Sequence, residues 1–163
     1  AATLSFIPSD SVIGIGETVG LDVVVSDAEP ERYLGTFDFN VNYDSSILDF
    51  NSYTLGNGLG NGSFDWSVGD LGSGTVNLSE LSLLEDLSSQ PDSFTLATLS
   101  FTGAAVGNSP LSFSEATLGD CLGDPISANL GTENINVVPI PGAVWLFASG
   151  LFGIAGIRRK IKK

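Results

Sequence analysis

The sequence contains no histidine, no methionine and a single cysteine, and each absence removes a class of chemistry. Without imidazole, the chain has no Ser-His-Asp triad, no histidine general base and no histidine metal ligand. One thiol cannot close an intrachain disulfide or supply an all-thiolate zinc site. Bases are also scarce, with six Lys and Arg against 19 Asp and Glu. Nucleic-acid binding is therefore excluded, because proteins that bind nucleic acids present basic faces.

What is present favours one folded domain. The 163 residues are 42% hydrophobic, which is enough to bury a core, and they include 20 glycines. Charged residues make up 15% of the chain, below the ~25% of an ordinary soluble domain. This composition argues against disorder and favours a β protein rich in turns.

The charges are divided unevenly along the chain. All 19 acids lie at or before Glu133, and Arg32 is the only base before Arg158, so residues 1–138 carry a formal charge of −18. The last six residues hold five of the six bases.

Between these regions, residues 137–157 contain no charged side chain. Their length is close to the roughly 20 apolar residues that a membrane-spanning helix needs, and bases directly after such a helix remain in the cytoplasm. The chain also opens on Ala1-Ala2-Thr3, as after removal of a signal peptide at small residues. We therefore expect an exported domain over residues 1–136 and a membrane-held segment over 137–163. A buried helix of the domain is the alternative for the tail.

The domain region alternates as β-strands do. The clearest run has apolar Phe37, Phe39 and Val41 on one side and polar Asp38, Asn40 and Asn42 on the other. Similar runs, separated by turn residues, follow along the chain: Leu4–Ile7, Val19–Val25, Leu48–Leu55, Phe64–Val68, Val76–Leu83, Phe94–Phe101, Leu111–Leu118 and Ile135–Val138. About nine short strands with one polar face each predict a sandwich of two sheets.

Two local details of the pattern can be tested. The run Leu111–Leu118 changes phase midway, which predicts a β-bulge near Glu115. Trp66 alternates in phase with Phe64 and Val68, and we therefore expect Trp66 to point inward.

The strand runs resemble those of a cohesin domain over roughly residues 2–138. The residues that carry this resemblance are Val12–Val25, Gly35–Asp44 with Ile47 and Leu48, Thr95–Phe101 and Pro110–Leu118. The resemblance implies an all-β fold, a jelly-roll sandwich of about nine strands that acts by binding and not by catalysis. One C-terminal apolar helix would follow it.

The tail resembles a PEP-CTERM sorting signal of the Val-Pro-x-Pro kind. The matching residues are Val138, Pro139, Ile140, Pro141, Arg158, Arg159 and Lys160. The resemblance implies export by a Gram-negative bacterium, a precursor held in the inner membrane, and cleavage near the Pro motif by an exosortase-type enzyme. The protein would then reach the cell surface or the medium. Pro-Ile-Pro here replaces the more usual Pro-Glu-Pro, which leaves the sorting enzyme and the cleavage point open.

If the tail is retained instead, its helix face matters. Ser149, Gly153 and Gly156 form a stripe of small residues that would let helices pack closely. The alternative to sorting is therefore a self-assembling filament or surface-layer subunit whose uncleaved tails associate.

Calcium is the one cofactor that the sequence suggests, because hard cations take carboxylate and amide oxygens from loops. Two groups qualify: Asn57, Asn61, Asp65 and Asp70, and Glu115, Asp120 and Asp124. Neither has EF-hand spacing, and turn-forming acids on an acidic surface explain both groups equally well.

We expect an exported, non-enzymatic module of the extracellular matrix or cell surface, because no catalytic motif stands among the acids. Its partner would be another copy of itself, another surface protein or an exopolysaccharide. A calcium-assisted glycan-binding domain is a further alternative, in which Trp66 or Tyr53 would serve as a platform if it faced outward.

Overall fold

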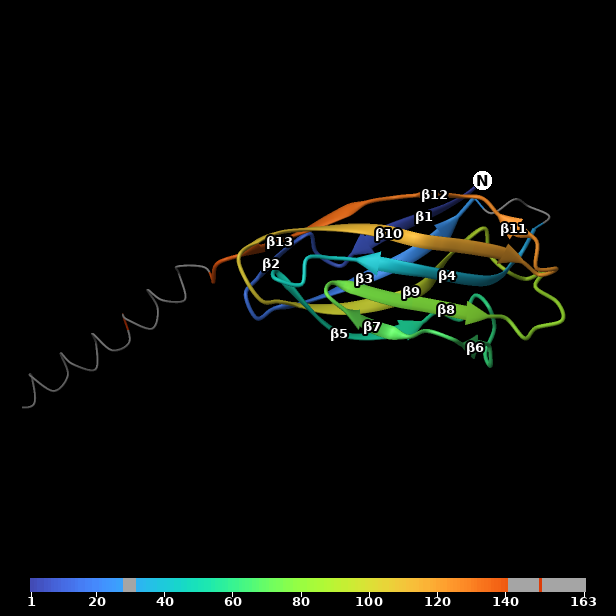
Figure 1. Cartoon of the computed structure of the whole chain (residues 1–163), viewed down its shortest axis with the longest axis horizontal. Helices are drawn as coiled ribbons and strands as arrows, with labels where there is room; N and C mark the ends of the chain where they lie inside the picture. The colour runs from blue at the N-terminus through green and yellow to red at the C-terminus, as the bar shows by residue number, and fades with distance from the viewer. Residues whose placement is uncertain (28–31, 141–149, 151–163) are drawn as a thin grey trace, which may run out of the picture.

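The computed structural model describes residues 1–27, 32–140 and 150, and within them the chain forms two packed β-sheets (Figure 1). The five-stranded sheet has the order β12 (Ala128–Leu130), β1 (Ala2–Pro8), β3 (Thr18–Ser26), β9 (Ser93–Gly103) and β5 (Leu48–Leu55). The eight-stranded sheet has the order β2 (Val12–Gly14), β13 (Glu133–Val138), β10 (Gly107–Asp120), β4 (Leu34–Asn42), β8 (Thr75–Leu81) and β6 (Phe64–Asp65). In addition, β11 (Pro125–Ile126) pairs with β10, and β7 (Gly69–Gly72) pairs with β8.

Most neighbouring strands are antiparallel, whereas β12 runs parallel to β1 and β2 runs parallel to β13. The chain changes sheet after β1, because β1 lies in the five-stranded sheet and the short β2 that follows lies in the other. This early crossing joins both layers within the first fourteen residues.

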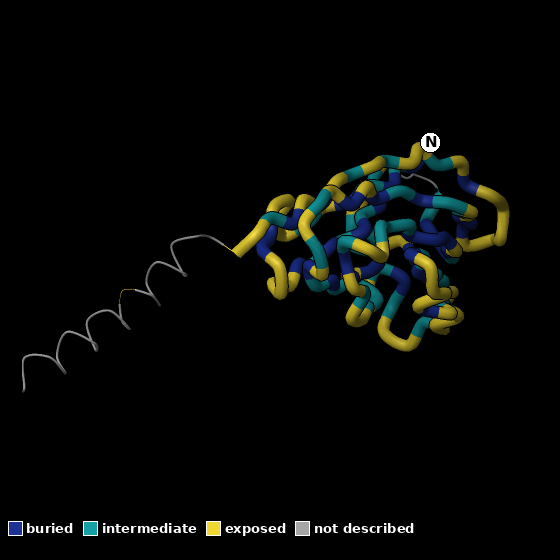
Figure 2. Tube along the Cα trace, turned by 60° about the vertical axis from the view of Figure 1, so that its left-hand side comes forward, coloured by how far each residue is buried: buried dark blue, intermediate teal, exposed yellow. Residues whose placement is uncertain are grey.

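Aromatic side chains fill the space between the sheets. Phe6 of β1 stacks on Phe113 of β10 with ring centroids 4.0 Å apart, which connects the two layers directly. Phe39 of β4 is fully buried and lies 5.1 Å from Phe37 and 5.4 Å from Phe113. Burying each such side chain stabilises the fold by about 1.5–3 kcal/mol. Figure 2 shows the buried residues along the interior of the domain and the exposed residues mostly at its periphery.

The predicted all-β sandwich is confirmed, and Phe37, Phe39 and Val41 point into the core as their alternation indicates. The described part of the chain contains more strands than expected, because short pairings such as β2, β6 and β11 add to the long runs. The bulge predicted near Glu115 is also present, as a register shift between Ser114 and Thr117.

Only a small part of the predicted C-terminal tail lies among the described residues. Val138 ends β13, and Pro139 and Ile140 follow it as exposed residues. The predicted boundary at residue 136 lies inside β13, and the predicted apolar helix after residue 140 lies outside the described residues apart from residue 150. Among the described residues, no helix has the length and apolar character needed to cross a membrane.

Candidate functional site

A connected network of polar side chains crosses the outer face of the eight-stranded sheet. The Asn77 side chain on β8 donates from Nδ2 to Asp38 Oδ1 at 2.9 Å and to Asn40 Oδ1 at 3.0 Å, both on β4. Asn40 in turn donates to Glu115 Oε2 on β10 at 2.8 Å. Asn77 Oδ1 also accepts from the backbone N–H of Val68 at 3.1 Å. These bonds hold the two carboxylates and the amides in fixed positions across three strands.

A second row of bonds runs beside the first. Thr75 Oγ1 donates to Asn42 Oδ1 at 3.2 Å, and Asn42 Nδ2 donates to Ser114 Oγ at 2.9 Å. The same three strands are therefore linked twice by side chains.

The bulge in β10 brings Glu115 onto this face. Its φ is +51°, in the left-handed region that costs a residue with a Cβ roughly 1 kcal/mol or more. The extra residue between Ser114 and Thr117 shifts the register with β4, and Glu115 thereby accepts the bond from Asn40. Backbone strain of this kind is often found at functional positions.

An apolar row lies along one side of the polar network. Trp66, Val68 and Leu71 are 61%, 68% and 50% exposed, and Leu81 is 39% exposed. Together with Asp38, Asn40, Asn77 and Glu115, these side chains line a shallow hollow of about 550 Å³. The face thus combines exposed apolar area with fixed polar groups.

The inward orientation predicted for Trp66 is wrong, because its side chain is exposed, as are those of the in-phase Phe64 and Val68. Alternation tells which residues share a side of a strand but not which side faces the core. Here β6 is only two residues long and lies at the edge of the sheet. The backbone N–H of Trp66 donates to Ser79 O at 2.9 Å. The indole packs on the Phe64 ring, with centroids 4.6 Å apart.

This edge is fastened to the other sheet through Asp65. Tyr53 of β5 donates its hydroxyl to Asp65 Oδ2 at 3.0 Å, and the Ser67 N–H donates to Asp65 Oδ1 at 2.8 Å. Burial alone would raise the pKa of Asp65, but these hydrogen bonds hold it below its usual value. Tyr53 is partly buried and bonded, so Trp66 is the more open ring of the two predicted platforms.

A buried acid lies beneath the same edge. Glu80 of β8 points inward and is 1% exposed; its Oε1 accepts a hydrogen bond from Ser63, and its Oε2 has no partner within the described residues. Burial raises the pKa of Glu80, and the nearby charge of Asp65 adds to this effect. Glu80 is in phase with the buried Val76 and Leu78, so the alternation of β8 held a signal for this buried acid that sequence reasoning did not use.

The first predicted calcium group is dispersed. Asp65 is engaged by Tyr53 and Ser67, and Asp70 Oδ1 accepts from the Gly72 N–H at 2.8 Å. The remaining members, Asn57 and Asn61, line a hollow that neither Asp65 nor Asp70 lines.

In the second predicted group, Asp120 and Asp124 lie together in one turn, and Glu115 lies apart from them. Glu115 bonds to Asn40, whereas Asp120 Oδ2 accepts from Arg32 Nη2 at 2.9 Å and from Arg32 Nε at 3.0 Å. Asp120 Oδ1 accepts backbone N–H groups, including that of Asp124 at 2.9 Å. Burial opposes the charge on Asp120, but these donors lower its pKa. Within residues 1–27 and 32–140, no cluster of three or more acids, His or Cys is placed to hold a metal ion.

The predicted sorting residues lie partly within the structure. Val138 is in register with Gly14, and its carbonyl accepts from the Ile15 N–H at 3.2 Å. The other members of the motif that are described are Pro139 and Ile140. The remaining sorting and helix-packing residues lie outside the described residues: Pro141, Ser149, Gly153, Gly156, Arg158, Arg159 and Lys160.

Sequence reasoning identified parts of the polar face but not its assembly. The outward positions of Asp38, Asn40 and Asn42 follow from alternation, and the bulge near Glu115 follows from the phase change. The pairing of β4 with both β8 and β10, which joins these residues to Asn77, has no signal in the sequence pattern.

Solved structures with the same fold are numerous. A cohesin module from a Clostridium perfringens family 33 glycoside hydrolase is similar with a TM-score of 0.70 at 14% identity, covering 85% of this chain and 96% of that one. A type II cohesin domain from the cellulosome of Acetivibrio cellulolyticus gives a TM-score of 0.70 at 18% identity, covering 83% and 95%. A non-cellulosomal cohesin from the archaeon Archaeoglobus fulgidus gives 0.64 at 14% identity, covering 83% and 91%.

Comparison with curated protein sequences found no match. The family model described as the cohesin domain, however, matches residues 5–133, which includes the polar face and the apolar row. The chain therefore belongs to the cohesin domain family.

Proposed function

We propose that this cohesin domain binds a protein partner through the outer face formed by β10, β4, β8 and the β6–β7 edge. The observation that carries this proposal is the row of exposed Trp66, Val68 and Leu71 beside a fixed polar network. Contiguous apolar side chains rimmed by polar groups are typical of interaction sites, and Trp is among the residues that contribute most to binding.

The charge of this face indicates the chemistry of the partner. Asp38 and Glu115 are exposed, and Arg32, the only base before Arg158, is bonded to Asp120. A partner with Lys or Arg beside its apolar contacts would therefore be complementary, and attraction would speed its approach.

Cohesin domains are non-catalytic modules that bind other proteins. A similar cohesin from Acetivibrio cellulolyticus has been solved in complex with a Cel5 dockerin, and one from Clostridium thermocellum forms a type I cohesin–dockerin complex. These relatives support a dockerin-like module as the class of partner for this chain.

The proposal is tested by titrating the full chain with a panel of purified dockerin modules and measuring dissociation constants by calorimetry. We expect saturable binding, weakened about tenfold or more by Trp66→Ala, because a Trp that acts as a binding hot spot contributes about 2 kcal/mol or more. Ile7→Ala is the matched control, since Ile7 is 55% exposed on the five-stranded sheet. Absence of binding to every module, or equal loss in both variants, would contradict the proposal.

We further propose that residues 137–163 determine where the module acts, through a membrane-held precursor that an exosortase-type enzyme processes at the bacterial surface. The support is the motif Val138–Pro141, the uncharged stretch after it and the bases at Arg158–Lys160. The intact mass of protein purified from its source tests this proposal. A C-terminus near residues 138–141 is expected, and a mass that still includes the bases at Arg158–Lys160 would contradict cleavage.

Self-assembly through uncleaved tails and calcium-assisted glycan binding stay predictions from the sequence. In the first, deletion of residues 139–163 would abolish association of the chain. In the second, added calcium would be needed for binding of a glycan.

A further inference from the structure

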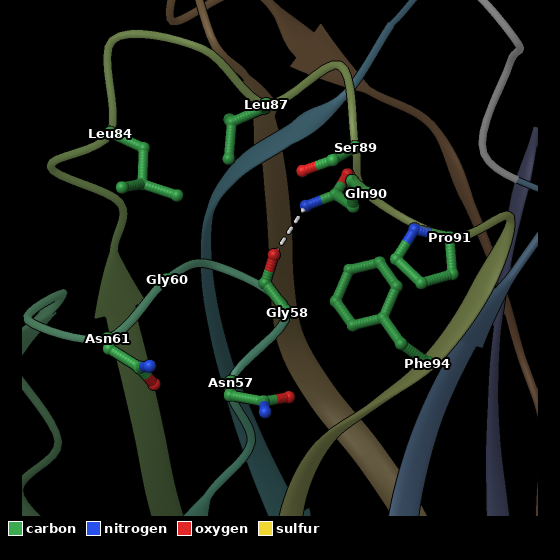
Figure 3. Close-up of a pocket in the computed structure, with 10 residues that line it drawn as sticks. All are labelled: Asn57, Gly58, Gly60, Asn61, Leu84, Leu87, Ser89, Gln90, Pro91 and Phe94. Atoms are coloured by element: carbon green, nitrogen blue, oxygen red, sulfur yellow. Dashed lines mark hydrogen bonds between the residues drawn. The ribbon is translucent and has the colours of Figure 1, made fainter.

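A second hollow, separate from the proposed partner-binding face, lies at one end of the sandwich between two loops (Figure 3). One loop, residues 56–63, connects β5 to β6, and the other, residues 82–92, connects β8 to β9. The hollow measures about 310 Å³, at the small end of the range for ligand pockets of about 300–1,000 Å³.

Gln90 fastens both loops to the body of the sheet. Its Oε1 accepts from the Leu34 N–H at 2.7 Å, and its Nε2 donates to Leu34 O and to Gly58 O, each at 3.0 Å. Both amide hydrogens of Gln90 are thereby used, one of them across the hollow to Gly58, as the dashed line in Figure 3 shows. The pocket is therefore formed before any ligand arrives.

Two glycines let the first loop lie directly on apolar side chains. A Cβ at Gly58 would collide with the Phe94 ring, and a Cβ at Gly60 would lie 2.6 Å from Leu84 Cδ1. Gly60 also has a φ of +103°, which side chains rarely adopt. The shape of the pocket thus depends on residues without side chains at these two positions.

The lining has two chemically different sides. Leu84, Leu87 and Phe94 supply apolar surface, whereas the side chains of Asn57, Asn61 and Ser89 supply polar groups. Within the described part of the chain, these three polar side chains make no hydrogen bond. They therefore remain available to a ligand.

No residue that lines this pocket carries a charge, although the surrounding domain is strongly acidic. The acids Glu85, Asp86 and Asp92 belong to the second loop but do not line the pocket. An anionic ligand would meet the repulsion of the domain, and a cationic ligand would find no carboxylate in the pocket. A purely apolar ligand would remove water from the polar side chains that it covers without replacing the lost hydrogen bonds, which is costly.

We propose that this pocket binds one unit of a neutral saccharide. A sugar ring presents apolar C–H groups on its faces and hydroxyl groups at its edges, which match the apolar and polar sides of the lining. Asn57, Asn61 and Ser89 exchange hydrogen bonds with the hydroxyls, while Leu84 and Phe94 cover the ring. This site shares no lining residue with the partner-binding face, so either can be right without the other.

The test titrates the ¹⁵N-labelled full chain, in a detergent without sugar headgroups, with glucose, galactose, mannose, N-acetylglucosamine and glucuronic acid. We expect saturable shifts of amide signals in residues 57–61 and 84–91 with at least one neutral sugar. Glucuronic acid should bind more weakly than glucose, because it adds a negative charge. Shifts with no neutral sugar, or equal binding of glucuronic acid, would overturn the proposal.

Variants locate the site. The double variant Asn57→Ala and Asn61→Ala should weaken binding about tenfold or more, since each lost hydrogen bond weakens binding several-fold. Both side chains are exposed and unbonded, so the fold is preserved. Asn129→Ala, which removes another exposed and unbonded amide on β12, is the matched control and should bind as the parent chain does. Equal affinity of the double variant and the control would place the sugar elsewhere and contradict the proposal.

Discussion

On the outer face of the five-stranded sheet, short polar side chains pair with one another. Thr98 Oγ1 donates to Asp22 Oδ1 at 2.6 Å, and Asn51 Nδ2 donates to Thr102 Oγ1 at 2.9 Å and to Ser100 Oγ at 3.2 Å. The outer face of the eight-stranded sheet has a polar network of the same kind, but the exposed apolar row of Trp66, Val68 and Leu71 adjoins it.

The difference between the faces arises at the edge of the sheet. Both faces follow from alternation within long strands, which turns polar residues toward water. The apolar row comes instead from the short β6–β7 edge, where hydrogen bonds to β8 hold residues that the core does not cover. Regular strands therefore supply a fixed polar surface, and an irregular edge adds the apolar contacts that make one face suited to binding.

The largest expected effect comes from changing the hydrophobic core, on which both sheets pack. Phe39→Ala should lower the free energy of unfolding by about 3–5 kcal/mol, because it opens a cavity in the core between the two sheets. Urea unfolding followed by circular dichroism measures this change. A loss below about 1 kcal/mol would mean that the two layers do not depend on a common core.

Charge should distinguish the two faces next. The double variant Asp38→Asn and Glu115→Gln should slow association with a cationic partner several-fold and reduce its dependence on salt, since it removes two charges from the proposed face. Asp22→Asn removes an acid from the opposite face and serves as the control. Stopped-flow measurements at two salt concentrations compare the association rates of the double variant and the control. Equal rates for the two would show that the charges of the eight-stranded face have no special role in binding.

The buried acid beneath the binding face gives a pH test. Burial raises the pKa of Glu80 above its ordinary 4.5, so the folded state holds this proton to higher pH than the unfolded state does. Its contribution to stability is complete below pH 4.5 and falls as pH rises toward the folded-state pKa. Glu80→Gln should therefore flatten this fall and raise the free energy of unfolding at pH 7, by on the order of 1 kcal/mol.

Unfolding by urea at pH 4 and pH 7 measures how Glu80→Gln changes the free energy of unfolding at each pH. The gain from Glu80→Gln should be larger at pH 7 than at pH 4. A loss of stability that is greater at pH 7 would show that the ionised carboxylate is well accommodated where it lies.

The smallest effect is expected on the other face. Thr98→Val removes an exposed hydrogen bond to Asp22 and should change the free energy of unfolding by no more than about 0.5 kcal/mol. Partner affinity should stay unchanged. Calorimetric titration and urea unfolding measure the two quantities, and weakened binding would assign a role to the five-stranded face.

Much of the scaffold could be predicted because it rests on local periodicity. Leu48–Leu55 forms β5 with the same bounds as its run, and the phase change in Leu111–Leu118 located the bulge. Such patterns report which residues share one side of a strand.

The functional face could be predicted only in part, because it depends on which strands become neighbours. Asn77 reaches Asp38 and Asn40 since β8 pairs with β4, and this pairing joins segments far apart in the sequence. Trp66 was misplaced because alternation does not indicate which side of an edge strand is covered. Glu80 was missed for a different reason: its phase with Val76 and Leu78 points inward, but an acid is ordinarily turned to water.

The most direct measurement is the footprint of a bound dockerin module on the ¹⁵N-labelled full chain, using the module that binds most tightly in the panel. We predict that amide shift changes concentrate in residues 36–42, 64–81 and 112–117, which form the polar network and the apolar row. Changes concentrated in β3 and β9 of the five-stranded sheet would contradict the account.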